Sequence, residues 1–200
     1  MLLGDENQAI RPGTATFARI RSILSEHGKA EECSLMTSYR SSPEITALFT
    51  AFLEEKDRIR TTSVQRPGQE PVIRTIKGRE AYLQALKEAL QEARESEGLT
   101  CMIAGSRRRL EKLSALLGDD APPVIRRDMS LPESGPVLME LPLVKGLEFD
   151  SVIIPDAVPE EYPEDSIGKH RLYTAISRAT RKVTIFAEDT MTALLGGWEN

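Results

Sequence analysis

Residues 144–187 read VKGLEFDSVIIPDAVPEEYPEDSIGKHRLYTAISRATRKVTIFA, and this stretch decides the fold. The apolar run Val152–Ile154 predicts a buried strand, Ile167–Ala179 predicts a helix, and Val183–Ala187 predicts a second buried strand. A chain that returns through a helix enters its next strand in the same direction, so the two strands are expected to be parallel. The stretch therefore predicts one unit of a parallel α/β sheet.

The same alternation of apolar runs and helix-period segments extends through the rest of the chain. Further strands are predicted at Met1–Leu3, Cys33–Thr37, Val72–Ile76, Thr100–Ala104 and Val137–Leu141; helices at Thr14–His27, from Ser42 onward, at Arg79–Glu97 and at Arg107–Leu117; and a loop at Thr61–Pro71. The order predicts an α/β fold, a mostly parallel sheet with helices on both faces. In such folds ligands bind beyond the carboxyl ends of the strands, so we expect functional side chains in the loops that follow them.

Charge and cysteine content exclude several classes of protein. The 26 Lys and Arg residues face 31 Asp and Glu residues, and the formal net charge of -5 excludes a uniformly basic protein that holds duplex DNA by charge alone. The two cysteines, Cys33 and Cys101, cannot form a disulfide framework or a four-ligand zinc site. No apolar run approaches the roughly 20 residues of a membrane helix. We expect a soluble cytoplasmic protein with no membrane partner and no metal site of its own.

Four segments carry polar residues that packing alone does not explain. They are residues 2–10 (LLGDENQAI), 38–45 (SYRSSPEI), 144–154 (VKGLEFDSVII) and 172–179 (LYTAISRA). The pattern GDxxQ is weak by itself, whereas KGLEFD followed by LYTAISRA is specific. All four in this order are more specific still.

Together these segments resemble motifs III, IV, V and VI of superfamily 1 helicases of the UvrD/Rep/PcrA type. The resemblance is closest to the HelD (helicase IV-like) branch, because only about a hundred residues separate motifs IV and V. It implies a RecA-like P-loop NTPase fold. Residues 1–29 would be the tail of a first RecA-like domain, and residues 30–200 would be the second RecA-like domain, the C-terminal one.

Two arginines are candidates for binding a nucleoside triphosphate. Hydrolysis needs positive charge where negative charge develops on the γ-phosphate, and a guanidinium can bind phosphate through two hydrogen bonds. Arg40 and Arg178 lie beside small residues near the ends of elements, so we expect them to project from the sheet edge. Either arginine alone would be explained more simply by a surface ion pair, but two arginines in these two contexts favour phosphate binding. The resemblance implies that both reach ATP held by the first domain, and that Gln8 senses its γ-phosphate.

Three neighbouring residues complete the predicted nucleotide site. Tyr39 precedes Arg40, and the resemblance implies that it stacks on adenine; the alternative is a tyrosine of the core or its rim. Glu148 can accept a hydrogen bond from a ribose hydroxyl, and the alternative is a glutamate at a helix start or in a salt bridge. Gly146 permits a close approach of the backbone.

Candidate nucleic-acid contacts lie in two places. By resemblance, Lys145 and Gly146 contact a nucleic-acid backbone. Arg107 opens a predicted helix, where a positive side chain opposes the helix dipole, and this suggests an anionic partner such as the phosphates of single-stranded DNA. A solvated basic cluster is the alternative.

Two parts of an ATPase are absent from this sequence. It contains neither the GxxxxGK[ST] phosphate loop nor the acidic motif II that holds Mg²⁺ and positions water. ATP with Mg²⁺ would therefore be held mainly by an upstream RecA-like domain, and we expect the chain alone to be inactive. An expressed fragment of a longer helicase explains this more simply than a natural truncated gene.

Departures from the motifs of relatives that unwind DNA leave two functions open. Glu140 and Pro142 stand where relatives that unwind DNA carry Thr and His, and Arg11 stands where an aromatic residue is expected. The preferred interpretation is the motor domain of an ATP-dependent DNA helicase or translocase. The alternative is a domain of a HelD-like ATPase that binds and remodels RNA polymerase with little unwinding.

Overall fold

The computed structural model describes residues 4–26, 37–38, 40–53, 55–58, 62–63 and 65–199. The predicted strand Met1–Leu3 lies outside the described residues, as do all but the last residue of the predicted strand Cys33–Thr37. No helix of the described ranges is long and apolar enough to cross a membrane.

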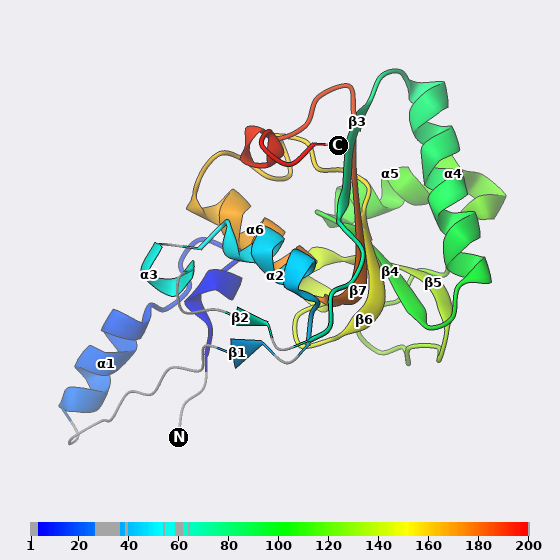
Figure 1. Ribbon diagram of the computed structural model, residues 1–200. Coiled ribbons are helices and arrows are strands. Elements are labelled where there is room, and N and C mark those ends of the chain that lie inside the picture. Colours follow the sequence, from blue (N-terminus) through cyan, green and yellow to red (C-terminus); the bar gives the residue numbers. More distant parts are fainter. Residues whose placement is uncertain are drawn as a thin grey trace.

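A five-stranded sheet forms the centre of the molecule (Figure 1). All neighbouring strands are parallel, and their order across the sheet is β3 (Val72–Ile76), β7 (Ala179–Glu188), β6 (Phe149–Ile154), β4 (Leu99–Ala104) and β5 (Gly135–Glu140). Strand β4 and the last three residues of β6 are almost continuously apolar because both faces of the sheet are covered there. The predicted parallel α/β sheet is confirmed.

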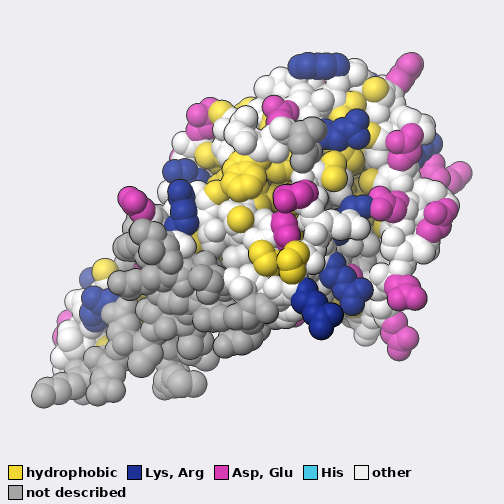
Figure 2. Space-filling model, in the orientation of Figure 1, with side chains coloured by type: hydrophobic (Ala, Val, Ile, Leu, Met, Phe, Trp, Pro, Cys, Tyr) yellow, Lys and Arg dark blue, Asp and Glu magenta, His cyan; other side chains and the backbone are white. Residues whose placement is uncertain are grey.

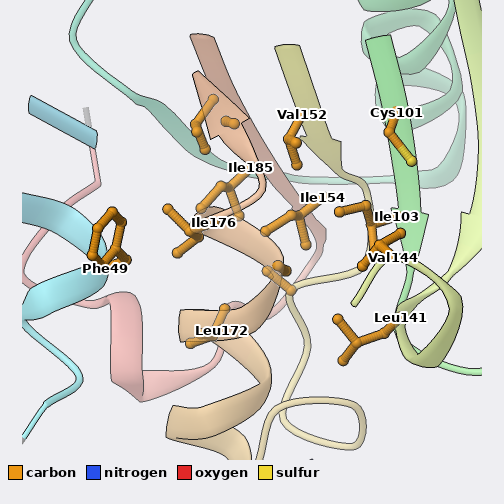
Figure 3. Packing of buried hydrophobic residues seen from close by; sticks show 14 of the residues in the cluster. Phe49, Cys101, Ile103, Leu141, Val144, Val152, Ile154, Leu172, Ile176 and Ile185 are labelled. Carbon is orange, nitrogen blue, oxygen red and sulfur yellow. The ribbon is translucent and has the colours of Figure 1, made fainter. Parts of the chain in front are cut away.

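Helices cover the sheet on both sides. On one face lie α4 (Arg79–Glu95) and α5 (Arg107–Leu117), whose buried leucines pack against Met102, Leu138 and Ile153. On the other face lie α2 (Pro43–Thr50) and α6 (Ser166–Ile176). Figure 3 shows the core on this second face, where Phe49, Leu172 and Ile176 approach Ile103, Val152, Ile154 and Ile185.

The parallel arrangement gives the sheet two chemically different edges. All strands begin along one edge, which we call the amino edge, and all end along the other, the carboxyl edge. Glu148 and Arg178 immediately precede β6 and β7, so both lie at the amino edge. After β4 the chain moves outward to β5, whereas after β6 it moves the opposite way to β7, so the strand order reverses between β4 and β6.

The start of α2 follows the sequence closely. Ser42 caps the helix by accepting a hydrogen bond from the Ile45 N–H, and Pro43 occupies the first helical position. The prediction of this helix start is confirmed. The loop predicted for Thr61–Pro71 is wrong at Thr62–Ser63, which form β2 and pair with β1 (Thr37–Ser38). A neighbouring strand supplied by a distant part of the chain overrides the local turn signal there.

The N-terminal part of the chain lies beside this sheet rather than in it. The short helix η1 (Glu6–Gln8) contacts α6, and α1 (Phe17–Ser25) begins after its capping residue, Thr16. No residue of α1 is buried, and Figure 1 shows this helix at a distance from the sheet. The remaining short helices are α3 (Glu55–Arg58), η2 (Gly118–Asp120), η3 (Leu141–Leu143) and η4 (Ala193–Leu195).

Candidate nucleotide site at the amino edge

Two serines fix the segment that carries Arg40 to the start of β7. The Ser41 hydroxyl donates a 2.6 Å hydrogen bond to the carbonyl oxygen of Ala179, and the Ser42 N–H donates one of 3.2 Å to Thr180. Both serines are buried. Because Arg40 precedes this pair of bonds and Arg178 precedes Ala179, two arginines that are far apart in sequence are held at the same edge.

Arg178 lies inside the protein and does not project from the edge as predicted. Only 3% of the residue is exposed. Its guanidinium donates hydrogen bonds to the Thr174 and Leu147 carbonyl oxygens, at 3.2 and 3.3 Å, and to the Ser177 hydroxyl at 3.0 Å. These acceptors at the end of α6 and before β6 draw the side chain inward.

The Arg178 charge has no direct carboxylate partner within the described ranges. Its acceptors are all neutral, and the pKa of its guanidinium is lowered first by burial and then by the positive charge of Arg40. Asp5, Glu148 and Tyr173 act in the opposite direction. An additional anion near Arg178 would therefore be favourable.

Arg40 and Glu148 form an ion pair across two loops. Their side chains keep 39% and 50% of their surface exposed, so solvent can reach both groups. Such an exposed pair contributes little to stability, and exchanging it for other partners is inexpensive. Glu148 therefore forms an ion pair, which was the alternative role that the sequence analysis gave for it.

Tyr173 joins the N-terminal segment to the same cluster. Its hydroxyl donates a 3.1 Å hydrogen bond to the Asp5 carboxylate, which also accepts one of 2.9 Å from the Gln8 side-chain amide. The ring of Tyr173 packs edge-on against Phe49 with centroids 5.4 Å apart. Burial, and then the Asp5 charge, raises the pKa of the Tyr173 hydroxyl well above its usual value, so the tyrosine stays protonated.

We call Asp5, Arg40, Glu148, Tyr173 and Arg178 the arginine cluster. Sequence reasoning named three of them and missed the roles of Asp5 and Tyr173. Asp5, the second residue of GDENQ, could have indicated a helix cap, and it does cap η1 by accepting the Asn7 N–H. Nothing in the sequence pairs Asp5 with Tyr173, because 168 positions separate them.

The other predicted nucleotide and nucleic-acid residues are distributed differently. Tyr39 lies outside the described residues. Gly146 has a φ of 86° in open space, and Lys145 is exposed; both belong to the loop that leads to Glu148. Arg107 lies at the opposite, carboxyl edge, where it pairs with Glu111 at 3.1 Å and is 75% exposed.

The expectation that functional side chains follow the strands is therefore wrong for Glu148 and Arg178. Both precede their strands, because a loop that returns a parallel strand must end at the amino edge. Arg40 follows the short strand β1 and is brought to them by the serine bonds to β7.

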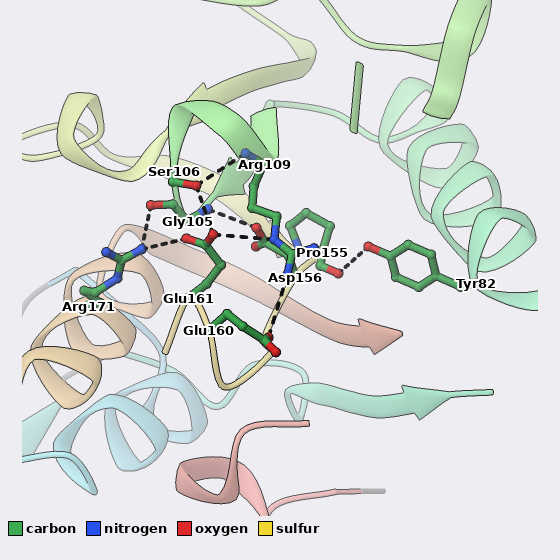
Figure 4. A network of polar contacts seen from close by, with 9 residues as sticks. All are labelled: Tyr82, Gly105, Ser106, Arg109, Pro155, Asp156, Glu160, Glu161 and Arg171. Atoms are coloured by element: carbon green, nitrogen blue, oxygen red, sulfur yellow. Dashed lines mark hydrogen bonds and ion pairs between the residues drawn. The ribbon is translucent and has the colours of Figure 1, made fainter. Parts of the chain in front are cut away.

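A polar network occupies the carboxyl edge where the strand order reverses (Figure 4). The Gly105 N–H donates a 3.2 Å hydrogen bond to Asp156, while Arg171 donates to the Gly105 carbonyl oxygen at 2.6 Å and pairs with Glu161 at 3.1 Å. Burial, the largest cause, raises the pKa of Asp156 to about 7, although the Gly105 N–H opposes this. Sequence reasoning missed this network.

The charges of the arginine cluster suit phosphate better than metal. Two guanidinium groups lie together there, and the described ranges contain no group of three or more His, Cys, Asp or Glu residues placed to hold a metal ion. Arginine binds phosphate oxygens through paired N–H donors, so an anionic phosphate is the ligand that these residues fit.

Comparison with known families locates the similarity in the second half of the chain. Residues 140–186 match the family model of the UvrD-like helicase C-terminal domain. The matched segment includes Glu148, Tyr173 and Arg178 of the arginine cluster. The search of curated proteins gives no match.

Solved structures give a match over most of the chain. The C-terminal domain of a possible DNA helicase from Lactobacillus plantarum WCFS1 is 28% identical, with a TM-score of 0.64, and the match covers 79% of this chain and 92% of that one. Weaker matches are a CRISPR-associated protein (12% identical, TM-score 0.39, 61% of this chain and 17% of that one) and the C-terminal part of the Fun30 ATPase domain (15%, 0.35, 54% and 40%). The first match shows that the sheet has the fold of a helicase C-terminal, RecA-like domain.

Proposed function

We propose that this chain is the C-terminal motor domain of an ATP-dependent superfamily 1 DNA helicase or translocase. Residues 1–29 would be the tail of a first RecA-like domain, and residues 30–200 the second. The observation that carries the proposal is the position of Arg40, Glu148 and Arg178 together at the amino edge. The family match to residues 140–186 supports it.

The arginine cluster would face ATP that an upstream RecA-like domain holds together with Mg²⁺. Arg40 and Arg178 would supply positive charge where negative charge develops on the γ-phosphate. Tyr39 would stack on adenine, and Gly146 would let the backbone approach the nucleotide. DNA would be contacted by Lys145 and Arg107.

The Arg40–Glu148 ion pair gives this site a resting arrangement. Without nucleotide, each of these two exposed groups neutralises the other. A nucleotide that presents a phosphate to Arg40 and a ribose hydroxyl to Glu148 would replace one ion pair with two charge-assisted hydrogen bonds. The exchange costs little, because the pair is solvated.

The N-terminal segment provides a physical connection to the upstream domain. Asp5 accepts hydrogen bonds from both Gln8 and Tyr173, and Tyr173 lies on α6, five residues before Arg178. A displacement of residues 4–10 would therefore act on the helix that ends at the buried arginine. This route would let Gln8 link the nucleotide state to domain movement.

The division of the site between two domains predicts the behaviour of the isolated chain. Purified residues 1–200 should bind ATP weakly and should hydrolyse none of it above the background of an Arg178→Ala control. Fusing the chain behind a first RecA-like domain should restore turnover. Hydrolysis by the isolated wild-type chain that disappears in the control would contradict the proposal.

Two finer expectations stay predictions from the sequence. None of the comparisons favours the HelD branch or RNA polymerase as a partner, and none tests a cytoplasmic location. Nucleic acid and an upstream domain are the partners that the similarity to a helicase C-terminal domain supports.

A further inference from the structure

A cavity of about 380 Å³ opens at the carboxyl edge, and we call it the acidic cavity. The starts of α4 and α5, the segment after β6 and the end of β7 contribute its lining. Tyr82, Arg109, Asp156 and Glu160 belong both to this lining and to the polar network of Figure 4. The volume is within the range of small-ligand pockets. Neither the sequence analysis nor the similarity to helicase domains assigns the cavity a role.

Negative charge predominates in the acidic cavity. Its charged lining residues are four acids, Asp156, Glu160, Glu188 and Asp189, and two bases, Arg79 and Arg109. Both bases already have partners, because Arg79 lies 2.7 Å from Glu188 and Arg109 lies 3.8 Å from Glu160. Figure 2 shows Asp and Glu side chains gathered along the right-hand side of the molecule, where Figure 1 places α4. This field attracts cations to the cavity.

Two carboxyl groups of the lining have no cation beside them. Among the residues that the structure describes, neither Asp156 nor Asp189 forms an ion pair. Asp189 accepts the Gly78 N–H at 2.8 Å, and Lys77 contacts the Asp189 carbonyl oxygen rather than its carboxylate. A positively charged ligand would therefore find two carboxyl groups that are available to it.

The floor of the cavity contains an oxygen atom without a partner. Asp156 is only 3% exposed, and its Oδ2 accepts the Gly105 N–H at 3.2 Å. Its Oδ1 is buried and has no hydrogen-bond partner within the described ranges. Leaving a buried acceptor unpaired is unfavourable. A ligand N–H that enters from the cavity would satisfy this oxygen.

The rest of the lining favours an organic cation over a metal ion. The described part of the chain contains no group of three or more His, Cys, Asp or Glu residues placed to hold a metal ion. Val158 is buried and lines the cavity together with Pro159 and Tyr82. Alkyl chains that carry a charged end pack well against such apolar surfaces.

We propose that the acidic cavity binds an ammonium or guanidinium group carried on an alkyl chain, with Asp156 and Asp189 as its carboxylate partners. Lysine and arginine side chains of a partner protein carry such a group, and so do free polyamines. The cavity and the arginine cluster lie at opposite edges of the sheet, so this inference goes beyond the proposed helicase function and does not depend on it.

Binding should depend on pH through Asp156. Burial, the largest cause, raises the pKa of its carboxyl to about 7, while the Gly105 N–H opposes the rise. The titratable and charged groups that face it are Tyr82, Arg109, Glu161, Tyr162 and Arg171. Burial raises the pKa of both tyrosines, so they stay protonated. Because a cation binds the ionised carboxylate, affinity should rise about tenfold from pH 6 to pH 8.

NMR titration of the 200-residue chain tests the proposal. The probes are Nα-acetyl-arginine amide, Nα-acetyl-lysine amide and spermidine, and Nα-acetyl-citrulline amide is the uncharged control of matched shape. The amide signals of Gly105 and Gly78 report on the two aspartates that accept their hydrogen bonds. At pH 8 we expect saturable shifts with a Kd on the order of 1 mM for the charged probes, and none for the control.

The three probes also distinguish the sources of the cation. Tighter binding of spermidine would support a free polyamine, and tighter binding of an amino-acid amide would support a side chain of a partner protein. Either order supports the site.

Two variants locate the binding. Asp156→Asn and Asp189→Asn each remove one carboxylate but keep an oxygen for the Gly105 or Gly78 N–H. Each should weaken binding at pH 8 at least roughly fivefold, and Asp156→Asn should also abolish the pH dependence. Glu111→Gln removes an acid that is 65% exposed outside the lining, and it should change Kd less than about twofold.

Circular dichroism and thermal melting verify that each variant is folded. No saturable shift with any charged probe, equal binding of the citrulline control, or an unchanged Kd in both folded aspartate variants would overturn the proposal.

Discussion

Ser41 donates its hydroxyl hydrogen to the carbonyl oxygen of Ala179 at 2.6 Å, and this one bond connects the residues that follow Arg40 and Arg178. It is buried, and it spans 138 positions of sequence. The two arginines therefore owe their shared location to this hydrogen bond between a side chain and the backbone rather than to their own charges, which repel.

Replacing Ser41 with alanine tests this connection. The change leaves the Ala179 carbonyl oxygen without its buried donor, and we expect unfolding free energy to fall by about 2 kcal/mol. Urea denaturation of the purified chain measures it. Ser25→Ala is the matched control, because the Ser25 hydroxyl also bonds to a carbonyl oxygen but is exposed. Equal losses of unfolding free energy in the two variants would show that the buried hydrogen bond stabilises the fold no more than the exposed one.

Glu148→Gln separates stability from nucleotide recognition. The ion pair with Arg40 is half-exposed, so unfolding free energy should change by less than about 0.5 kcal/mol. In the protein with its upstream domain, KM for ATP should rise roughly tenfold because the ribose hydroxyl loses a charged acceptor. ATP analogues that lack the 2′ or the 3′ hydroxyl give the control. For the analogue that lacks the hydroxyl bound by Glu148, the substitution should not raise KM any further. An equal KM increase with ATP and both analogues would exclude the ribose contact.

Asp156 should make stability depend on pH. Its pKa is raised from 3.8 to about 7 by burial, so the folded state binds its proton more tightly than the unfolded state does. The contribution of Asp156 to the free energy of unfolding is fully present below pH 4 and is lost as pH rises through 7. The total loss is on the order of 4 kcal/mol.

Asp156→Asn removes that titration. The amide oxygen can still accept the Gly105 N–H, so the variant should be more stable than the wild type at pH 8 and similar to it at pH 4. Denaturation at several pH values provides the measurement, with the exposed Glu160→Gln as control. A wild-type protein whose stability rises from pH 5 to pH 8 relative to the variant would contradict the assignment.

Gly168→Ala tests how closely α6 packs against the backbone of Pro163. An added Cβ would lie 1.8 Å from the carbonyl oxygen of Pro163, which is backbone and cannot turn aside. We expect a loss of about 3 kcal/mol from overpacking, measured by thermal or urea unfolding. Gly197→Ala, where a Cβ meets nothing within 4 Å, is the control. Similar stability of the two variants would mean that α6 can shift without cost.

The sequence predicts elements well where local pattern and tertiary structure agree. The strand Val72–Ile76 and the helix Arg107–Leu117 have their predicted bounds, and α2 begins at its predicted cap. The pair β1–β2 was missed at Thr62–Ser63, because two-residue strands have no period of their own and depend on a distant partner.

The site was predicted in part for a similar reason. Arg40, Glu148 and Arg178 could be named from their motifs, and the structure places them at one edge. The direction of the return loops determines at which edge of the sheet these residues lie. The carbonyl oxygens of Thr174 and Leu147, which accept hydrogen bonds from Arg178, account for its burial. No local pattern reveals the roles of Asp5, Tyr173 and Asp156, because these roles depend on contacts between distant segments.

The most direct test of the central claim is steady-state ATP turnover by the protein that joins this chain to its upstream RecA-like domain. Arg178→Ala should reduce kcat by roughly 10³-fold, Arg178→Lys should restore little because a lysine lacks the paired donors, and the exposed Arg74→Ala on β3 should match the wild type. Folding of each variant is verified by circular dichroism. Near-normal kcat in a folded Arg178→Ala variant would contradict the account.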